Sequence, residues 1–161
     1  MVGNIEEERR KVLFLCIGNS CRSQMAEGFA SKYGSDVLEP SSGGTAPASI
    51  IQPLTKKVME AKNISLDEQY PKHYSVFDFD TFDLIVNMSG YKLHFRPTAE
   101  LREWKVVDPI RQSEEVYIAV RDQIEDLVMR LILELRSGRT VDKPAASVRG
   151  SSLFRMGRRR G

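Results

Sequence analysis

Two short and almost wholly apolar runs are the clearest pattern in the chain: residues 11–16 (KVLFLC) and 83–88 (DLIVNM). Runs of this kind are typical of parallel strands whose two faces are both buried. Weaker strands are predicted at residues 37–42, before a pair of glycines, and at 105–107, where two valines precede Asp108. The pattern therefore predicts a sheet of about four strands.

Helical periodicity fills the stretches between these strands. The longest predicted helix covers residues 113–136, where apolar side chains recur every three or four positions and a serine followed by two glutamates suits the N-terminus. Shorter helices are predicted at 23–33 and 53–61, a helical turn at 75–79, and a helical or looped segment at 97–104. Strands that alternate with helices favour an α/β fold of three layers, with a central parallel sheet flanked by helices on both faces.

The chain of 161 residues has the length of one domain. Residues 1–10 are interpreted as a polar leader, 11–138 as a single domain and 139–161 as a flexible basic tail. The tail has seven Lys or Arg and one Asp, whereas the whole chain has a net charge of only +2, so the basicity belongs to the tail. Docking of the tail on an acidic surface is a weaker alternative to a solvated terminus. Because only one aromatic residue, Phe154, lies among its charges, base stacking is not indicated and no nucleic-acid partner is expected.

Composition narrows the class of protein. Hydrophobic residues make up 41% and charged residues 29% of the chain, as in soluble globular proteins. No apolar run approaches the ~20 residues that span a bilayer, and the first residues lack the apolar core of a secretory signal. The two cysteines lie close together, which suits a reducing compartment better than a disulfide scaffold. We expect a cytoplasmic protein without membrane contact, and the sequence leaves the oligomeric state open.

Cys16 and Arg22 bracket five residues between the first predicted strand and the first predicted helix. A loop in this place turns backbone N–H groups inward, and the helix N-terminus adds the positive end of its dipole, which together form a cradle for a tetrahedral oxyanion. The same field favours the thiolate, the nucleophilic form of cysteine. The planar guanidinium of Arg22 can hold two oxygens of a phosphoryl group. This segment is therefore interpreted as a phosphate site that uses cysteine chemistry.

The expected anion-binding loop consists of Ile17, Gly18, Asn19, Ser20, Cys21, Arg22 and Ser23. Gly18 and Asn19 tolerate the positive φ that a tight turn requires, and Ser23 is placed to donate a hydrogen bond to the Cys16 sulfur. The alternative is a buried, unreactive thiol at the end of a strand. The functional interpretation is preferred because a merely structural cysteine needs neither Arg22 nor Ser23.

The segment LFLCIGNSCRSQMAEGFA resembles the active-site segment of the low-molecular-weight protein tyrosine phosphatases and of the arsenate reductases that share their fold. Three later segments resemble further motifs of that family, in the same order: residues 42–45 (SGGT), residues 73–75 (HYS) and the pair Asp108-Pro109. The resemblance covers residues 11–135, which is most of the chain.

The resemblance implies a role for each matching residue, and it implies neither a cofactor nor a metal. Cys16 is the nucleophile, Arg22 stabilises the equatorial oxygens, and Asp108 is the general acid that protonates the leaving oxygen. Taken alone, Asp108 is more typical of a turn before proline, and the acid is preferred because of the cysteine loop and the order of the family motifs. The supporting residues that hold the loop are Asn19, Ser23, Ser42 and His73. Among them, His73 is expected to lie against Asn19.

The family includes two activities. Because the hydrolytic set of Cys16, Arg22 and Asp108 is complete, the main prediction is a phosphatase for phosphate monoesters, with a phosphorylated protein or a small aryl phosphate as substrate. Thioredoxin-coupled arsenate reductases keep a cysteine pair after the strand that matches residues 83–88, where this chain has Ser89. Reduction of arsenate by an external thiol or glutaredoxin is thus the alternative. A second alternative is a phosphate-binding module without turnover.

Two further questions stay open at this point. The Cys21 thiol is suited either to trapping an oxidised Cys16 as a reversible disulfide or simply to packing the start of the helix. The aromatic residues Tyr91, Phe95 and Trp104 are suited either to lining a substrate cleft or to filling the core.

Overall fold

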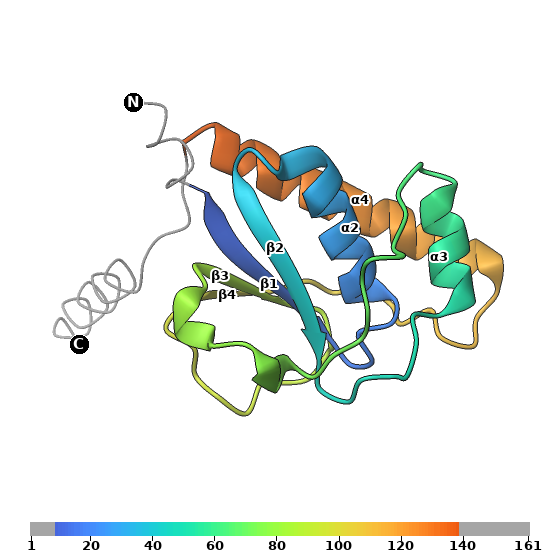
Figure 1. Cartoon of the computed structure of the whole chain (residues 1–161), viewed down its shortest axis with the longest axis horizontal. Coiled ribbons are helices and arrows are strands. Elements are labelled where there is room, and N and C mark those ends of the chain that lie inside the picture. Colours follow the sequence, from blue (N-terminus) through green and yellow to red (C-terminus); the bar gives the residue numbers. More distant parts are fainter. Residues whose placement is uncertain (1–8, 139–161) are drawn as a thin grey trace, which may run out of the picture.

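The computed structural model describes residues 9–138, which contain a four-stranded parallel sheet (Figure 1). Its strands are β1 (Arg10–Cys16), β2 (Leu38–Gly44), β3 (Leu84–Asn87) and β4 (Glu100–Glu103), in the spatial order β2-β1-β3-β4. β1 pairs in parallel with β2 on one side and with β3 on the other. The strand order therefore reverses at β1, and open α/β sheets bind ligands beyond the carboxyl end of the strand at such a point.

Three α-helices pack on one face of this sheet: α2 (Arg22–Gly34), α3 (Pro53–Glu60) and α4 (Glu114–Arg136). Val12 and Phe14 of β1 point to this face because side chains alternate along a strand. α4 begins as the sequence predicts, since the Ser113 side chain accepts a hydrogen bond from the Val116 N–H at 3.4 Å.

The opposite face is covered by shorter elements. Leu13 and Leu15 pack there with Phe82 and Ile85. Two 3₁₀ turns, Tyr74–Val76 and Phe79–Thr81, contribute the aromatic side chains that cover this second cluster. The predicted α/β fold with a parallel sheet between two helical layers is thus confirmed, with single turns in place of long helices on the second face.

The strand predicted at residues 105–107 is wrong, because the fourth strand is β4, which runs through a stretch expected to be helical or looped. β4 is an edge strand, and its sequence ELRE has no apolar run. Arg102 is held by Glu100 at 2.8 Å and by Glu134 of α4 at 2.6 Å. The Val106 carbonyl makes no ladder bond but accepts a hydrogen bond from the Arg22 side chain.

The expectations for a polar leader and a basic tail fall almost entirely on residues 1–8 and 139–161, which lie outside the described residues. Within residues 9–138, no helix is both long enough and apolar enough to cross a membrane.

Candidate active site

The loop from Cys16 to Arg22 is concave because its carbonyl groups are turned outward. The carbonyl oxygens of residues 16, 17, 18 and 20 accept hydrogen bonds of 2.8 to 3.1 Å from backbone N–H groups of residues 45–52. The Asn19 carbonyl accepts one from Nε2 of the buried Gln24 at 2.9 Å. In a trans peptide the N–H group points opposite to the preceding carbonyl. The N–H groups of residues 17–21 therefore face the concave side, which is the geometry of an anion nest.

Close approach of β2 to this loop depends on one glycine. A Cβ on Gly44 would lie 2.5 Å from the carbonyl oxygen of Ile17 and 3.0 Å from two atoms of Asn19, all of them close to the main chain. Any larger residue would therefore push the loop away from the segment that orients its carbonyls.

The Asn19 side chain holds the loop in shape through buried hydrogen bonds. It is fully buried and has a φ of 49°, a left-handed conformation that asparagine tolerates. Its Nδ2 donates to Ser23 Oγ at 2.7 Å and to Ser42 Oγ at 3.0 Å. Its Oδ1 accepts the backbone N–H of Lys72 at 2.9 Å. The bond to Lys72 fixes which end of the amide is the donor.

The structure does not place His73 as the resemblance implies. Nδ1 of His73 lies 2.8 Å from Ser75 Oγ and accepts the Ser75 N–H at 3.0 Å. Within residues 9–138, no hydrogen bond joins His73 to Asn19, and the main chain of Lys72 occupies that position instead. His73 is therefore a local cap of the turn Tyr74–Val76.

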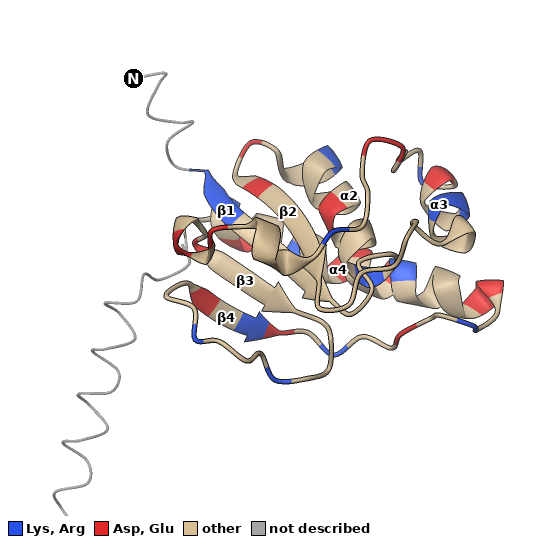
Figure 2. Cartoon of the chain, turned by 60° about the horizontal axis from the view of Figure 1, so that its bottom comes forward, with Lys and Arg blue, Asp and Glu red and all other residues tan. Residues whose placement is uncertain are grey.

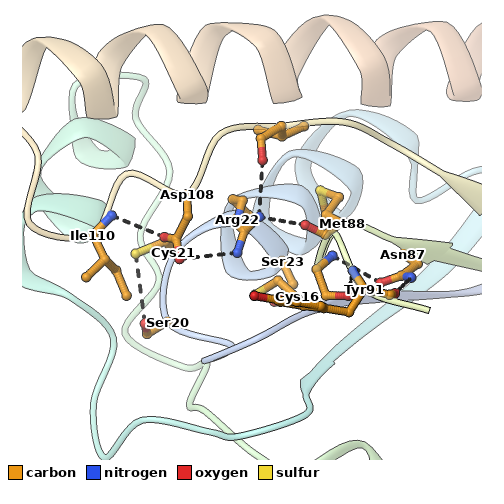
Figure 3. Close-up of polar contacts among 12 residues, drawn as sticks. Cys16, Ser20, Cys21, Arg22, Ser23, Asn87, Met88, Tyr91, Asp108 and Ile110 are labelled. Atoms are coloured by element: carbon orange, nitrogen blue, oxygen red, sulfur yellow. Dashed lines mark hydrogen bonds and ion pairs between the residues drawn. The ribbon is translucent and has the colours of Figure 1, made fainter. Parts of the chain in front are cut away.

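The Cys16 sulfur lies at the end of β1, buried, and 2.9 Å from Ser23 Oγ (Figure 3). Ser23 Oγ also accepts a hydrogen bond from Asn19, and its own hydrogen is available to the sulfur. The two expected supporting residues, Asn19 and Ser23, thus act as one chain that ends at the nucleophile.

Arg22 is held in a fixed orientation between two neighbouring segments (Figure 3). Its Nη1 donates to the carbonyl oxygens of Met88 at 2.6 Å and Val106 at 3.1 Å. Its Nη2 lies 3.4 Å from Asp108 Oδ2. Its Nε is buried and has no hydrogen-bond partner among residues 9–138. A buried guanidinium N–H without a protein acceptor is suited to an anionic ligand.

Asp108 lies at the rim of the same site (Figure 3). Its side chain is 41% exposed, whereas that of Arg22 is 5% exposed. Oδ1 accepts the Ile110 N–H at 3.1 Å, which fixes the carboxylate in the turn before α4. Asp108 is therefore exposed to solvent beside the buried Arg22 guanidinium.

The Cys21 thiol is directed into the protein between the loop and α4. Its sulfur is 3.8 Å from Ser20 Oγ and 4.0 Å from the Tyr117 hydroxyl. Burial raises the pKa of the Cys21 thiol, although the hydroxyls of Thr55, Ser20 and Tyr117 act in the opposite direction. Burial also raises the pKa of Tyr117 to about 12. Cys21 is thus a protonated thiol, and both cysteines are free.

Polar contacts behind the loop include residues that the sequence analysis missed. Ser42 Oγ donates to Glu27 Oε1 at 2.6 Å, and Lys72 Nζ donates to the Ser42 carbonyl at 3.1 Å. Burial raises the pKa of Glu27 and lowers that of Lys72. Glu27 and Gln24 are spaced to share one face of a helix, but nothing in the sequence indicates that their partners lie on β2 and in the loop.

The aromatic residues left open by the sequence line two neighbouring grooves. Trp104 lines a groove of about 690 Å³, and Phe95 lines another of about 440 Å³. Tyr91 lines both, because the chain after β3 runs between them. All three residues therefore border a groove.

Comparison with known proteins gives a consistent picture. The family model described as low molecular weight phosphotyrosine protein phosphatase matches residues 11–141. A glutaredoxin arsenate reductase of Synechocystis sp. is 35% identical over 130 residues, which cover 78% of this chain and 98% of the relative. Arsenate reductase 1 of Bacillus cereus is 34% identical over 122 residues, or 73% of this chain and 90% of the relative. A solved structure described as an arsenate reductase in the phosphate binding state has a TM-score of 0.73 at 33% identity, and the match covers 78% of this chain and 98% of that one.

These relatives correct the prediction of activity. The main prediction, a phosphatase for phosphate monoesters, is wrong, because the two curated relatives and the solved structure described above, which match over most of the chain, are arsenate reductases. A phosphorylated protein as partner has no support among them. The reason for the error is chemical: arsenate and phosphate are tetrahedral oxyanions of the same charge, so the same cradle, arginine and aspartate suit both.

Proposed function

The chain belongs to the low molecular weight phosphotyrosine protein phosphatase family, and from this premise we propose that it is an arsenate reductase that takes its electrons from an external thiol. The observation that carries the proposal is the similarity, along nearly the whole length of the relative, to a glutaredoxin arsenate reductase. The anion nest with a buried, unpartnered Arg22 Nε supports it, because this arrangement suits a tetrahedral oxyanion.

In the first half of the reaction the loop binds arsenate. The N–H groups of residues 17–21 and Arg22 Nε donate hydrogen bonds to its oxygens, and this fixed array stabilises the charge that develops on them. The Cys16 thiolate attacks arsenic while Asp108 gives a proton to the departing oxygen, which leaves as water. A bond between the Cys16 sulfur and arsenic(V) results.

In the second half an external thiolate attacks the Cys16 sulfur. A mixed disulfide forms, the sulfur–arsenic bond breaks, and its electron pair stays on arsenic, which leaves as arsenite, As(III). A second thiol then attacks the mixed disulfide, restores the Cys16 thiolate and releases an oxidised disulfide. Two thiols thus supply the two electrons.

The thiols are external because the 161 residues contain only Cys16 and Cys21. An internal relay needs a second cysteine that reaches Cys16 and a third that reaches the second. Cys21 can supply at most one of them. The reaction therefore suits a compartment such as the cytoplasm, where small thiols are kept reduced.

Arsenite formation tests this proposal directly. The protein is incubated with arsenate and glutathione, with and without glutaredoxin, and arsenite is measured by liquid chromatography with elemental mass spectrometry. We expect arsenite from the wild type and none above background from Cys16→Ser, whose fold is checked by circular dichroism. Inorganic phosphate is expected to inhibit competitively, because it binds in the same loop.

Parallel assays separate the other candidates. Hydrolysis of p-nitrophenyl phosphate without arsenite formation under any thiol would overturn the proposal in favour of a phosphatase. Arsenite formation with thioredoxin alone, equal to that with glutathione and glutaredoxin, would overturn the assignment of the reductant.

A further inference from the structure

The groove of about 690 Å³ is linked to the anion-binding loop through Arg22. Met88 and Val106 line it, and their carbonyl oxygens are the two that hold Arg22. The Met88 N–H donates to the Leu15 carbonyl at 2.7 Å, one residue before Cys16. Val107, also in the lining, immediately precedes Asp108. Met88 is therefore hydrogen-bonded to the strand that ends in Cys16, and Val107 adjoins Asp108 in the chain.

The walls of this groove are mainly apolar. Trp104 and the aliphatic residues form them, and Tyr91 and Val107 remain 70% and 63% exposed. Its volume falls in the range of roughly 300–1,000 Å³ that is usual for small-molecule sites, which combine apolar walls with a few polar groups. The groove thus has the size and lining for a small organic molecule.

The rim of the groove carries two positive charges and one negative charge. Lys92 and Lys105 are exposed, and neither forms an ion pair with another residue in the range 9–138. Glu103 is exposed and accepts a hydrogen bond from Asn87 Nδ2 at 3.1 Å. Figure 2 shows basic positions on the chain that joins β3 to β4 and on the stretch that follows β4. The complementary ligand carries two negative charges and one positive charge.

We propose that this groove binds the thiol reductant itself, a small peptide thiol of the glutathione type with two carboxylates and one ammonium group. The two lysines pair with the carboxylates, Glu103 pairs with the ammonium, and the apolar walls hold the central thiol-bearing residue next to Cys16. This inference rests on the proposed arsenate reduction and names the co-substrate of the same site.

A redox protein is a poorer fit for the groove. Protein partners dock on a broad and nearly flat surface of about 800 Å² per side, whereas this groove is concave and has the volume of a small ligand. The bound thiolate attacks the Cys16 sulfur in the arsenic adduct, becomes the outer half of the mixed disulfide, and is released when a second thiol attacks. No further oxidant or reductant is needed.

Trp104 provides a test that needs no turnover, because it is the only tryptophan in the chain and lines the groove. S-methylglutathione, which has the charges of glutathione but no free thiol, is titrated while Trp104 fluorescence is recorded. We expect a saturable change for the wild type. Loss of one exposed ion pair of about 1 kcal/mol corresponds to an approximately fivefold weaker Kd for Lys105→Gln. Lys32→Gln, a matched neutralisation of an exposed lysine on α2, is expected to leave the Kd unchanged.

Steady-state kinetics add a second readout. Lys105→Gln is expected to raise the KM for glutathione by about the same factor and to leave turnover with the uncharged thiol dithiothreitol unchanged. No Trp104 response, or equal Kd values for Lys105→Gln and Lys32→Gln, would overturn the groove as the thiol site. An effect of Lys105→Gln on glutaredoxin alone would do the same. A normal Trp104 response without arsenite formation would overturn the proposed function and leave the binding site standing.

Discussion

Replacement of Asn19 by alanine probes how the anion-binding loop is held in shape. The Asn19 side chain donates to Ser23 and Ser42 and accepts the N–H of Lys72, all within the interior. Alanine removes the three bonds together and leaves the Lys72 N–H without its acceptor. It must also adopt the φ of 49°, which suits asparagine but not alanine.

The expected loss can be worked out from these contacts. Three buried hydrogen bonds contribute about 1 kcal/mol each, and a left-handed alanine costs about 1 kcal/mol more, so the free energy of unfolding falls by about 3–5 kcal/mol. Domains of this size have roughly 5–15 kcal/mol in total, so the variant is expected to fold but to unfold at much lower urea. Its turnover falls as well, because Ser23 is no longer oriented to donate to the Cys16 sulfur.

His73→Ala is the matched control, since the family resemblance assigns the support of Asn19 to that side chain. Within the described residues the His73 side chain forms hydrogen bonds only with Ser75, so we expect a loss below about 1 kcal/mol and nearly unchanged turnover. Urea unfolding followed by Trp104 fluorescence gives both values. Equal losses for His73→Ala and Asn19→Ala, or a loss below 1 kcal/mol for Asn19→Ala, would refute the assignment of the support to the Lys72 main chain.

Three further predictions concern other parts of the site. Asp108→Asn is expected to lower kcat for arsenate by about 10²–10⁴-fold with little change in KM, and an unchanged kcat would exclude Asp108 as the acid. Burial raises the pKa of Glu27 in the folded protein above its usual 4.5. The protonated Glu27 therefore contributes fully to the free energy of unfolding below the unfolded-state pKa, and this contribution is lost as the pH rises through the folded-state pKa. At a pH below the unfolded pKa of Glu27, the Glu27→Gln variant should therefore have the same free energy of unfolding in urea as the wild type. At a pH above the folded pKa, its free energy of unfolding should be larger than that of the wild type. Cys21→Ser is expected to reduce arsenate normally but to lose recovery by dithiothreitol after peroxide treatment, and equal recovery would assign Cys21 to packing alone.

Features encoded in short runs of sequence are the ones that sequence analysis predicts well here. The apolar runs give β1 and β3, the three-to-four periodicity and Ser113 give α4, and the order of the elements gives the parallel sheet. The spacing of Cys16 and Arg22 between a strand and a helix is also a local pattern.

Features made by distant main-chain contacts leave no such pattern. The segment 45–52 turns the loop carbonyls outward through its backbone N–H groups, which any non-proline sequence provides. Lys72 supports Asn19 through its backbone N–H, which the residue type does not reveal. The resemblance therefore assigns this support to the side chain of the neighbouring His73. β4 is an edge strand with three charged residues, and the ion pair of its Arg102 with Glu134 of α4 is visible only after folding. The types of residue in the sequence therefore indicate the candidate reactive side chains, but they do not indicate which backbone segments hold those side chains in position.

The error over activity has a related cause. In the proposed reaction the loop, Arg22 and Asp108 act on the first half, in which a thiolate displaces an oxygen from a tetrahedral centre, and that half is the same for phosphate and arsenate. The phosphatase and reductase reactions differ only in the step that cleaves the covalent adduct on the cysteine. A phosphorus adduct is opened by water at phosphorus, whereas an arsenic(V) adduct is opened by a thiol at sulfur because arsenic accepts the electron pair. The residues that decide between them are those that bring the second nucleophile to Cys16, and in this chain Lys92, Glu103 and Lys105 on the rim of the neighbouring groove are placed to bring a charged thiol.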